Sequence, residues 1–241
     1  MSAFRVVSLL TAWAVILIAA DASWENKAAA AWTEDDARQI LAESPWAKTT
    51  QAMISPLQTE DERRAGGKMG QDQGLGFDGI ADDRPRIQAP KSAIDIVRPE
   101  ALAPAPSQFI RLRVRWESAL PIRVAELKSH VVEVLTLDRN GYSIGIYGIP
   151  AARSSGGGPK SVADSLKNQA VLKRDGKEDV RPFSVEVLRR DDGPVIVYVF
   201  PLSAEISKND RRIEFEARIG RIAIAQFFDL AQMQFQGKLE L

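Results

Sequence analysis

Residues 183–200, FSVEVLRRDDGPVIVYVF, carry the pattern that decides the fold. Two runs rich in β-branched and aromatic residues, 183–189 and 195–200, flank the turn-forming residues Asp191-Asp192-Gly193, which predicts a β-hairpin. The second run is apolar at every position, so we expect a central strand that is buried on both faces.

Alternating residues extend the sheet on both sides of this hairpin. Apolar and charged residues alternate over 110–117 (IRLRVRWE) and 212–219 (RIEFEARI), the period of half-buried strands. A further strand is expected over 142–147, and Gly220 is expected to turn the chain into a strand over 222–228. The predicted fold class is α+β, with a mainly antiparallel β-sheet or sandwich-like core and a few short helices.

The helices are predicted from their first and last residues. Thr33 and Asp36 form a variant of the capping box, and Ser44-Pro45 ends this helix because the residue before proline avoids the helical region. Two more helices are expected to begin at serines: Ser118 before 119–128, and Ser161 before a helix ending at about Asn168.

The N-terminal residues are typical of an exported protein. One positive residue, Arg5, precedes an apolar run over 6–20, which is short for a membrane span of roughly 20 residues. Ala20-Asp21-Ala22 is a cleavage signature, so residues 1–22 are predicted to be a signal peptide cut before Ser23. The alternative is an uncleaved N-terminal anchor.

Three further regions follow the signal peptide. Residues 23–57 are predicted to form an N-terminal helical segment, and residues 109–241 an α+β domain. Residues 58–108 between them are rich in glycine and proline and poor in large apolar residues. Such a stretch buries too little apolar surface to offset its ordering entropy, so we interpret it as a flexible linker or a long surface loop.

Composition excludes several classes of function. The chain has 32 Lys and Arg against 32 Asp and Glu, so it lacks the basic excess expected of a nucleic-acid-binding protein. It has no cysteine, which excludes disulfides, thiolate nucleophiles, iron–sulfur clusters and a lipoprotein anchor. The absence favours an exported bacterial protein, periplasmic or secreted.

Motifs that suggest catalysis lack the context they need. Residues 141–145 match G-x-S-x-G, but strand-like residues follow and the one histidine, His130, precedes the serine. We instead expect a strand in which two glycines allow close packing. Residues 74–79 match a dinucleotide fingerprint but lie in the linker. His130 and the pairs Asp82-Asp83 and Asp191-Asp192 do not form a metal-site pattern. No catalytic, cofactor-binding or metal-ligating residue is predicted.

Arg111, Arg113 and Arg115 are predicted to share one face of a strand. One interpretation is an anion site for a glycan, a lipid phosphate or nucleic acid. The other is a solvated face, or pairing with an acidic neighbouring strand, for which Glu214 and Glu216 have the right period. We favour the second and keep the three arginines as the weak candidate anion-binding face.

A set of segments resembles a known group of proteins. The segments are WT (32–33), Leu41, SPWA (44–47), RWESALP (115–121), VLKRDGK (171–177), FP (200–201), FE (215–216) and the C-terminal GKLEL (237–241). Together they resemble an uncharacterised family of exported acidobacterial proteins, over most of the chain except the signal and the linker. The resemblance implies an exported bacterial protein and supplies no activity or site residues.

The sequence therefore favours a non-enzymatic exported domain that binds a ligand or an envelope component. No cofactor and no nucleic acid are expected, and membrane contact is expected only if the N-terminal segment is uncleaved. The alternative is an extracytoplasmic hydrolase that uses carboxylates not identifiable from the sequence.

Overall fold

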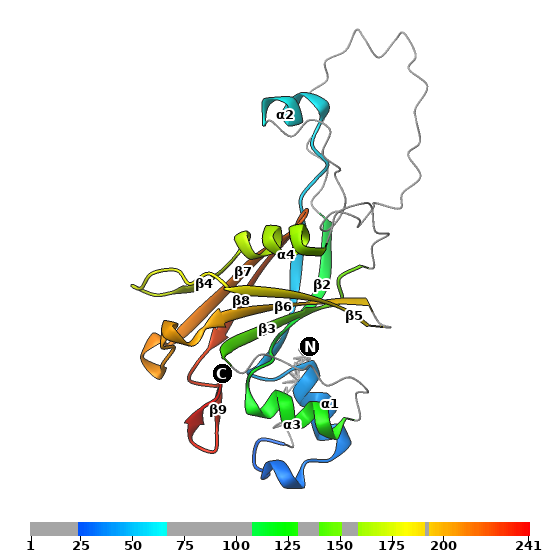
Figure 1. Ribbon diagram of the computed structural model, residues 1–241. Coiled ribbons are helices and arrows are strands. Elements are labelled where there is room, and N and C mark those ends of the chain that lie inside the picture. The colour runs from blue at the N-terminus through cyan, green and yellow to red at the C-terminus, as the bar shows by residue number, and fades with distance from the viewer. Residues whose placement is uncertain (1–23, 67–107, 130–139, 151–158, 191–192) are drawn as a thin grey trace, which may run out of the picture.

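A single curled antiparallel sheet dominates the molecule (Figure 1). The computed structural model describes residues 24–66, 108–129, 140–150, 159–190 and 193–241. Within these residues, eight strands pair in the order β4-β7-β8-β1-β2-β3-β6-β5. Their bounds are β1 (Ala47–Ile54), β2 (Gln108–Trp116), β3 (Gly141–Tyr147), β4 (Ala170–Arg174), β5 (Ser184–Arg190), β6 (Gly193–Pro201), β7 (Arg212–Ile219) and β8 (Ile222–Asp229). A small hairpin, β9 (Gln234–Phe235) and β10 (Lys238–Leu239), lies near the C-terminus.

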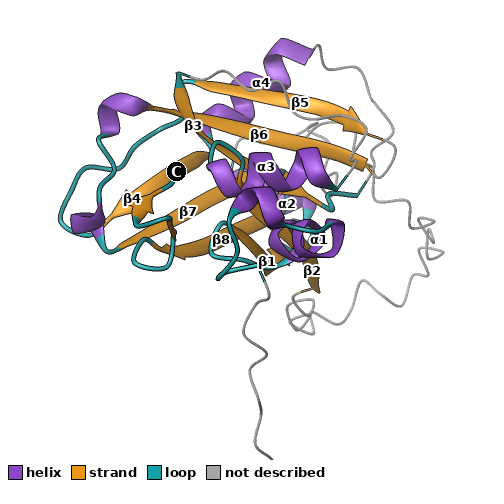
Figure 2. Ribbon diagram, turned by 90° about the horizontal axis from the view of Figure 1, so that it is seen from below, coloured by secondary structure: helices purple, strands orange, loops and turns teal. Residues whose placement is uncertain are grey.

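The sheet curls until its two halves share one core. Tyr198 on β6 contacts Phe215 on β7 edge to face, with ring centroids 5.5 Å apart, although four strands separate β6 from β7 in the sheet order. Trp116 on β2 contacts Phe228 on β8 in the same way, at 5.4 Å. In Figure 2, β5 and β6 lie across from β7, β8 and β1. The inward side chains of both halves therefore bury one another.

The described residues form four short α-helices, with α1 and α3 at one end of the sheet and α4 and α2 toward the other (Figures 1 and 2). They are α1 (Glu34–Ala42), α2 (Glu60–Ala65), α3 (Leu120–Lys128) and α4 (Pro159–Asn168). Helices α1 and α3 pack together at one end, and α4 packs against β5. The expected capping box of α1 is confirmed: the Thr33 hydroxyl accepts from the Asp36 N–H, and the Asp36 carboxylate accepts from the Thr33 N–H.

An aromatic cluster joins the N-terminal and C-terminal parts of the described chain. Trp24 contacts both Trp32 and Trp46, and Trp32 contacts Phe235. The Trp46 indole N–H donates to the Glu240 carbonyl at 2.8 Å, across 194 residues of sequence. The aromatic cluster therefore ties the start of β1 to the C-terminal hairpin.

The structure confirms the β-rich, mainly antiparallel fold with a few short helices. The predicted hairpin is β5 and β6, paired from Ser184↔Val199 to Arg190↔Gly193, and residues 195–200 of β6 are buried at every position. Two cap predictions are wrong. Ser161 is not the N-cap of α4, because that helix already begins at Pro159. Ala119, not Ser118, is the N-cap of α3, because the Ser118 hydroxyl instead accepts from the Ser143 N–H on β3 at 3.0 Å.

Strands β1 and β4 were not predicted; β1 lies between β8 and β2, and β4 lies at the edge of the sheet beside β7. Residues 23–57 thus contribute a strand to the same sheet as residues 109–241. Helix α2 lies in the interval interpreted as linker, and it has its own capping box from Thr59 and Glu62. The predicted signal peptide and most of the linker lie outside the described residues. Within the described part of the chain, no helix is long and apolar enough to span a membrane.

Candidate functional site

A buried ionic cluster lies where β2, β3 and α3 meet. It consists of Arg115 at the end of β2, Glu117 just after it, Glu126 on α3 and Tyr147 at the end of β3. Arg115 is 5% exposed, Glu117 0%, Glu126 2% and Tyr147 8%. Charged side chains are almost never buried to this extent unless they are paired. We therefore call these four residues the buried cluster and consider its contacts first.

Arg115 is the hub of the buried cluster. Its Nε donates to Oε1 of Glu117 at 2.8 Å and its Nη2 donates to Oε2 at 2.9 Å, so the pair is bidentate. Nη2 also contacts Oε1 of Glu126 and lies 2.5 Å from the Tyr147 hydroxyl. That hydroxyl donates to Oε1 of Glu117 at 2.7 Å, and the guanidinium lies 4.2 Å from the centroid of the Tyr147 ring. Bidentate geometry with charged partners makes these the strong kind of hydrogen bond.

The electrostatics of the buried cluster keep Arg115 charged and Tyr147 neutral. Burial alone would lower the pKa of Arg115, but the charge of Glu117, together with smaller contributions from Tyr147 and Glu126, raises it overall. Burial raises the pKa of Tyr147, and the charge of Glu117 raises it further, so the phenol keeps its proton and can donate. One arginine faces two glutamates, which leaves no positive charge for an external anion.

A glycine on β3 makes room for the Glu117 carboxylate. A Cβ on Gly145 would lie 2.6 Å from Oε1 of Glu117, closer than side-chain atoms can approach. A Cβ on Gly141 would lie 2.5 Å from Cγ1 of Val199. The expectation that the glycines of this segment allow close packing is therefore confirmed. Ser143 between them is fully buried within β3, which continues to Tyr147, so no helix follows the serine.

The three arginines of β2 do not share one environment. Arg111 and Arg113 are exposed, whereas Arg115 is part of the buried cluster. The proposed facing of these arginines by Glu214 and Glu216 is wrong. Strand β2 pairs with β1 and β3, and β7 lies three positions away in the sheet order. Anion binding by Arg111 and Arg113 stays a prediction.

A buried carboxylate outside the buried cluster lies in the connection between β6 and β7. The Asp210 side chain is fully buried, 2.6 Å from Nζ of Lys177, and accepts from the Ser207 N–H at 2.8 Å. Burial alone would raise the pKa of Asp210, but the hydrogen bonds from Lys177 and Ser207 and the charges of Lys177 and Arg174 lower it overall. This contact fixes a connection and lines no groove.

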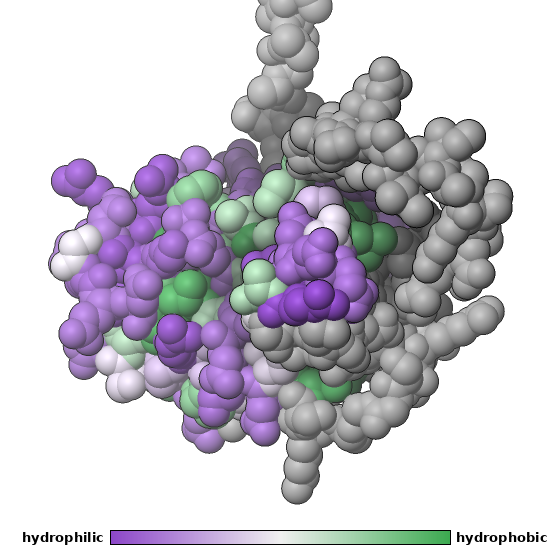
Figure 3. Space-filling model, turned by 90° about the horizontal axis from the view of Figure 1, so that it is seen from above, coloured by the Kyte–Doolittle hydropathy of each residue, from purple (hydrophilic) through white to green (hydrophobic). Residues whose placement is uncertain are grey.

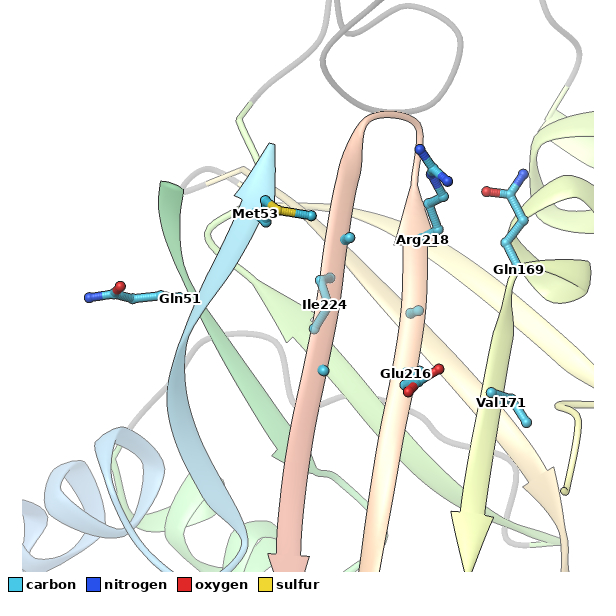
Figure 4. Close-up of a pocket in the computed structure, with 10 residues that line it drawn as sticks. Gln51, Met53, Gln169, Val171, Glu216, Arg218 and Ile224 are labelled. Carbon is cyan, nitrogen blue, oxygen red and sulfur yellow. The ribbon is translucent and has the colours of Figure 1, made fainter. Parts of the chain in front are cut away.

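The outer surface of the sheet carries a shallow groove of about 470 Å³ (Figure 4). Side chains from β1, β4, β7 and β8 line it: Gln51, Met53, Gln169, Val171, Glu216, Ala217, Arg218, Ala223, Ile224 and Ala225. Small side chains on β8, between longer ones on β1 and β7, form its floor. We call the exposed side of β2, β1, β8, β7 and β4 the outer face.

The remaining residues considered in the sequence lie outside the described chain. These are His130, the glycines at 74–79 and the pairs Asp82-Asp83 and Asp191-Asp192. Among the described residues, no group of three or more His, Asp or Glu side chains is placed to hold a metal ion.

No sequence pattern pointed directly to the buried cluster, because Arg115 has the same alternating position as Arg111 and Arg113. One signal was present. Glu126 follows Ala125 and stands four residues after Ile122, on the face of α3 that packs inward. A scan against protein-family models found no matching family, and searches of curated proteins and of solved structures found no significant match.

Proposed function

We propose that this chain is an exported, non-enzymatic domain that binds a component of the bacterial cell envelope through the outer face of its sheet. The observation that carries the proposal is the contrast between the two sites. The outer face has a groove lined by apolar and charged side chains that a ligand can contact. The charged side chains of the buried cluster instead bind one another.

The outer face has the composition of a binding surface. Met53 and Phe227 are exposed by 43% and 45%, and both project from strands that form it. Ionic side chains stand beside them, among them Lys173, whose ammonium lies 2.7 Å from Oε1 of Glu216. An exposed apolar patch rimmed by polar residues is typical of an interaction site.

Filling the groove tests the proposal. Ala225 is exposed on the groove floor, so Ala225→Trp fills the groove without entering the core. The matched control, Ala231→Trp, makes the same change at an exposed residue of the turn after β8, outside the outer face. We expect the full chain to co-sediment with isolated bacterial envelopes, Ala225→Trp to reduce the bound fraction several-fold, and the control to bind like the wild type. Equal binding by all three proteins would refute the use of this face.

Export is part of the same proposal and rests on residues 1–22. The intact mass of protein recovered from the periplasm or medium of an expressing bacterium should equal that of a chain beginning at Ser23. A recovered mass that includes residues 1–22 would support the uncleaved anchor instead. The kinship with exported acidobacterial proteins likewise remains a proposal.

One observation favours a second candidate, an extracytoplasmic hydrolase. Glu117 and Glu126 both contact the same guanidinium nitrogen, so two carboxylates lie close together beside a tyrosine. Close carboxylate pairs are the machinery of glycoside hydrolysis. Both are almost fully buried, however, and a substrate would have to displace Arg115 to reach them. Loss of a measurable hydrolysis of envelope glycan in Glu126→Gln, with folding retained, would favour this candidate.

A further inference from the structure

One end of the outer face combines apolar and basic side chains in a row that crosses four strands. Phe109 on β2 pairs with Met53 on β1, Met53 pairs with Ala223 on β8, and Ala223 pairs with Arg218 on β7. Directly paired residues lie on the same side of a sheet. We call this set, with Arg111 and Arg113 on the adjoining positions of β2, the basic edge. Figure 4 shows Met53 and Arg218 near the ends of their strands, beside the β7–β8 turn.

The apolar part of the basic edge is strongly exposed. Phe109 is 62% exposed and Met53 is 43% exposed, and the two are cross-strand neighbours. Leu57, three residues after the end of β1, is 53% exposed. Large apolar side chains gathered at the tip of paired strands are suited to entering the boundary between headgroups and acyl chains. Viewed from this end, the described surface is mostly hydrophilic with apolar patches between (Figure 3).

The basic part of the basic edge is available for an external anion. Within the described residues, Arg111 and Arg113 have no carboxylate partner. The Arg218 guanidinium contacts neutral acceptors, the Gly220 carbonyl at 3.2 Å and the Ser55 hydroxyl at 3.3 Å. The nearest acidic residue of β7 on the outer face, Glu216, is already paired with Lys173. The charge of the three arginines is thus not offset by the sheet itself.

We infer that the basic edge docks on a membrane surface that contains anionic phospholipids. Phe109 and Met53 would insert at the interface while Arg111, Arg113 and Arg218 contact lipid phosphates. Charge complementarity selects an anionic surface, and the exposed apolar pair selects a bilayer over a soluble polyanion. The inference rests on the proposed binding function and names its partner. It does not require the apolar residues 6–20, so it holds whether or not they are removed.

Vesicle co-sedimentation tests the inference. The full chain is mixed with vesicles of phosphatidylglycerol and phosphatidylcholine in equal amounts, or of phosphatidylcholine alone, and the ratio of the two affinities is measured. Residues 6–20, where retained, contribute to both affinities, so the ratio reports the basic edge. We expect the triple variant Arg111→Gln, Arg113→Gln, Arg218→Gln to lower the affinity for anionic vesicles about a hundredfold, because each arginine near such a surface contributes about a factor of five.

Three controls make the outcome decisive. Arg38→Gln, Arg123→Gln, Arg181→Gln removes the same charge at exposed positions away from the basic edge, and should bind like the wild type. Met53→Ser with Phe109→Ser should lower anionic-vesicle affinity about tenfold, since two apolar side chains no longer insert. Thermal unfolding of each variant should match the wild type, because every substituted residue is exposed.

The possible results test three statements separately: the role of the basic edge, docking on a membrane, and binding to the envelope. Equal loss in the two triple variants would show a general charge effect and refute the basic edge. Full affinity in the Met53 and Phe109 variant, with competition by soluble polygalacturonate, would show a polyanion site and refute membrane docking. Retention on envelopes without retention on anionic vesicles would leave the proposed function standing and overturn the lipid inference alone.

Discussion

Strand β2 carries both exposed and buried arginines, which differ in their burial and in their side-chain partners. Arg111 and Arg113 project from the outer face with no described carboxylate partner. Arg115, two residues further, is 5% exposed and binds two glutamates and a tyrosine. All three project on the same side of the strand. The difference lies in their side-chain partners: Glu117, Glu126 on α3 and Tyr147 bind Arg115, whereas Arg113, the cross-strand neighbour of Tyr147, stays exposed.

This contrast assigns different roles to chemically identical residues. A buried arginine that is saturated by carboxylates holds elements together and has no capacity for a ligand. An exposed arginine without an ionic partner adds little to stability and is free to meet one. The following predictions test this division, from the largest expected effect to the smallest.

Removing the hub of the buried cluster should have the largest effect. In Arg115→Met, Glu117 and Glu126 remain buried without their cation, and breaking a buried pair in this way costs about 3–5 kcal/mol. We expect urea unfolding to show a loss of this size in the free energy of unfolding. In the control Arg113→Met the change should stay within about 0.5 kcal/mol, since the side chain is exposed. Similar losses in both variants would mean that the division of β2 is wrong.

Adding one methyl group beside the buried cluster should have a moderate effect. The Cβ of Gly145→Ala would lie 2.6 Å from Oε1 of Glu117, so the carboxylate must move off its bidentate contact. Overpacking of this kind costs about 1–3 kcal/mol, measured by urea or thermal unfolding. Gly66→Ala is the control, because its Cβ meets no side chain at the exposed end of α2. Wild-type stability in Gly145→Ala would indicate that Glu117 is less firmly placed than the structure shows.

Asp210 should give a smaller, pH-dependent effect. Its pKa is lowered in the folded state, so its contribution is complete above the ordinary value of about 3.9 and is lost as the pH falls through the lower folded pKa. We expect Asp210→Asn to cost about 1 kcal/mol at pH 7. The difference from wild type should shrink between pH 4 and pH 2, as followed by urea midpoints. A difference that stays constant over that range would show that the charge of Asp210 is unimportant.

Local periodicity was enough to predict most of the strands. The alternation over 110–117 and 212–219 identified β2 and β7, and the fully apolar run over 195–200 identified a strand buried on both sides. In contrast, β1 was missed because its residues 48–51 are polar throughout, and only Ala47, Ala52 and Ile54 are buried. A strand with so few apolar positions has no readable period.

The pairing partners of each strand could not be predicted from the sequence. Pairing of β1 with β8 depends on residues far apart in the chain, such as Met53 and Ala223, and nothing local specifies it. The buried cluster could not be predicted for the same reason, because residues of α3 and β3, which come later in the sequence, bury Arg115. The groove of the outer face likewise arises from side chains on separate strands.

The position of β1 between β2 and β8 has a consequence for how the chain acquires its fold. The Thr50 hydroxyl meets the Ala225 carbonyl across 175 residues, and Trp46 meets Glu240 across 194. Contacts this distant in sequence place the fold among slow folders, because long loops must close before their contacts stabilise anything. During synthesis, one side of β1 has no strand to pair with until β8 has been made. The topology thus delays completion of the sheet until the last strands of the chain have been made.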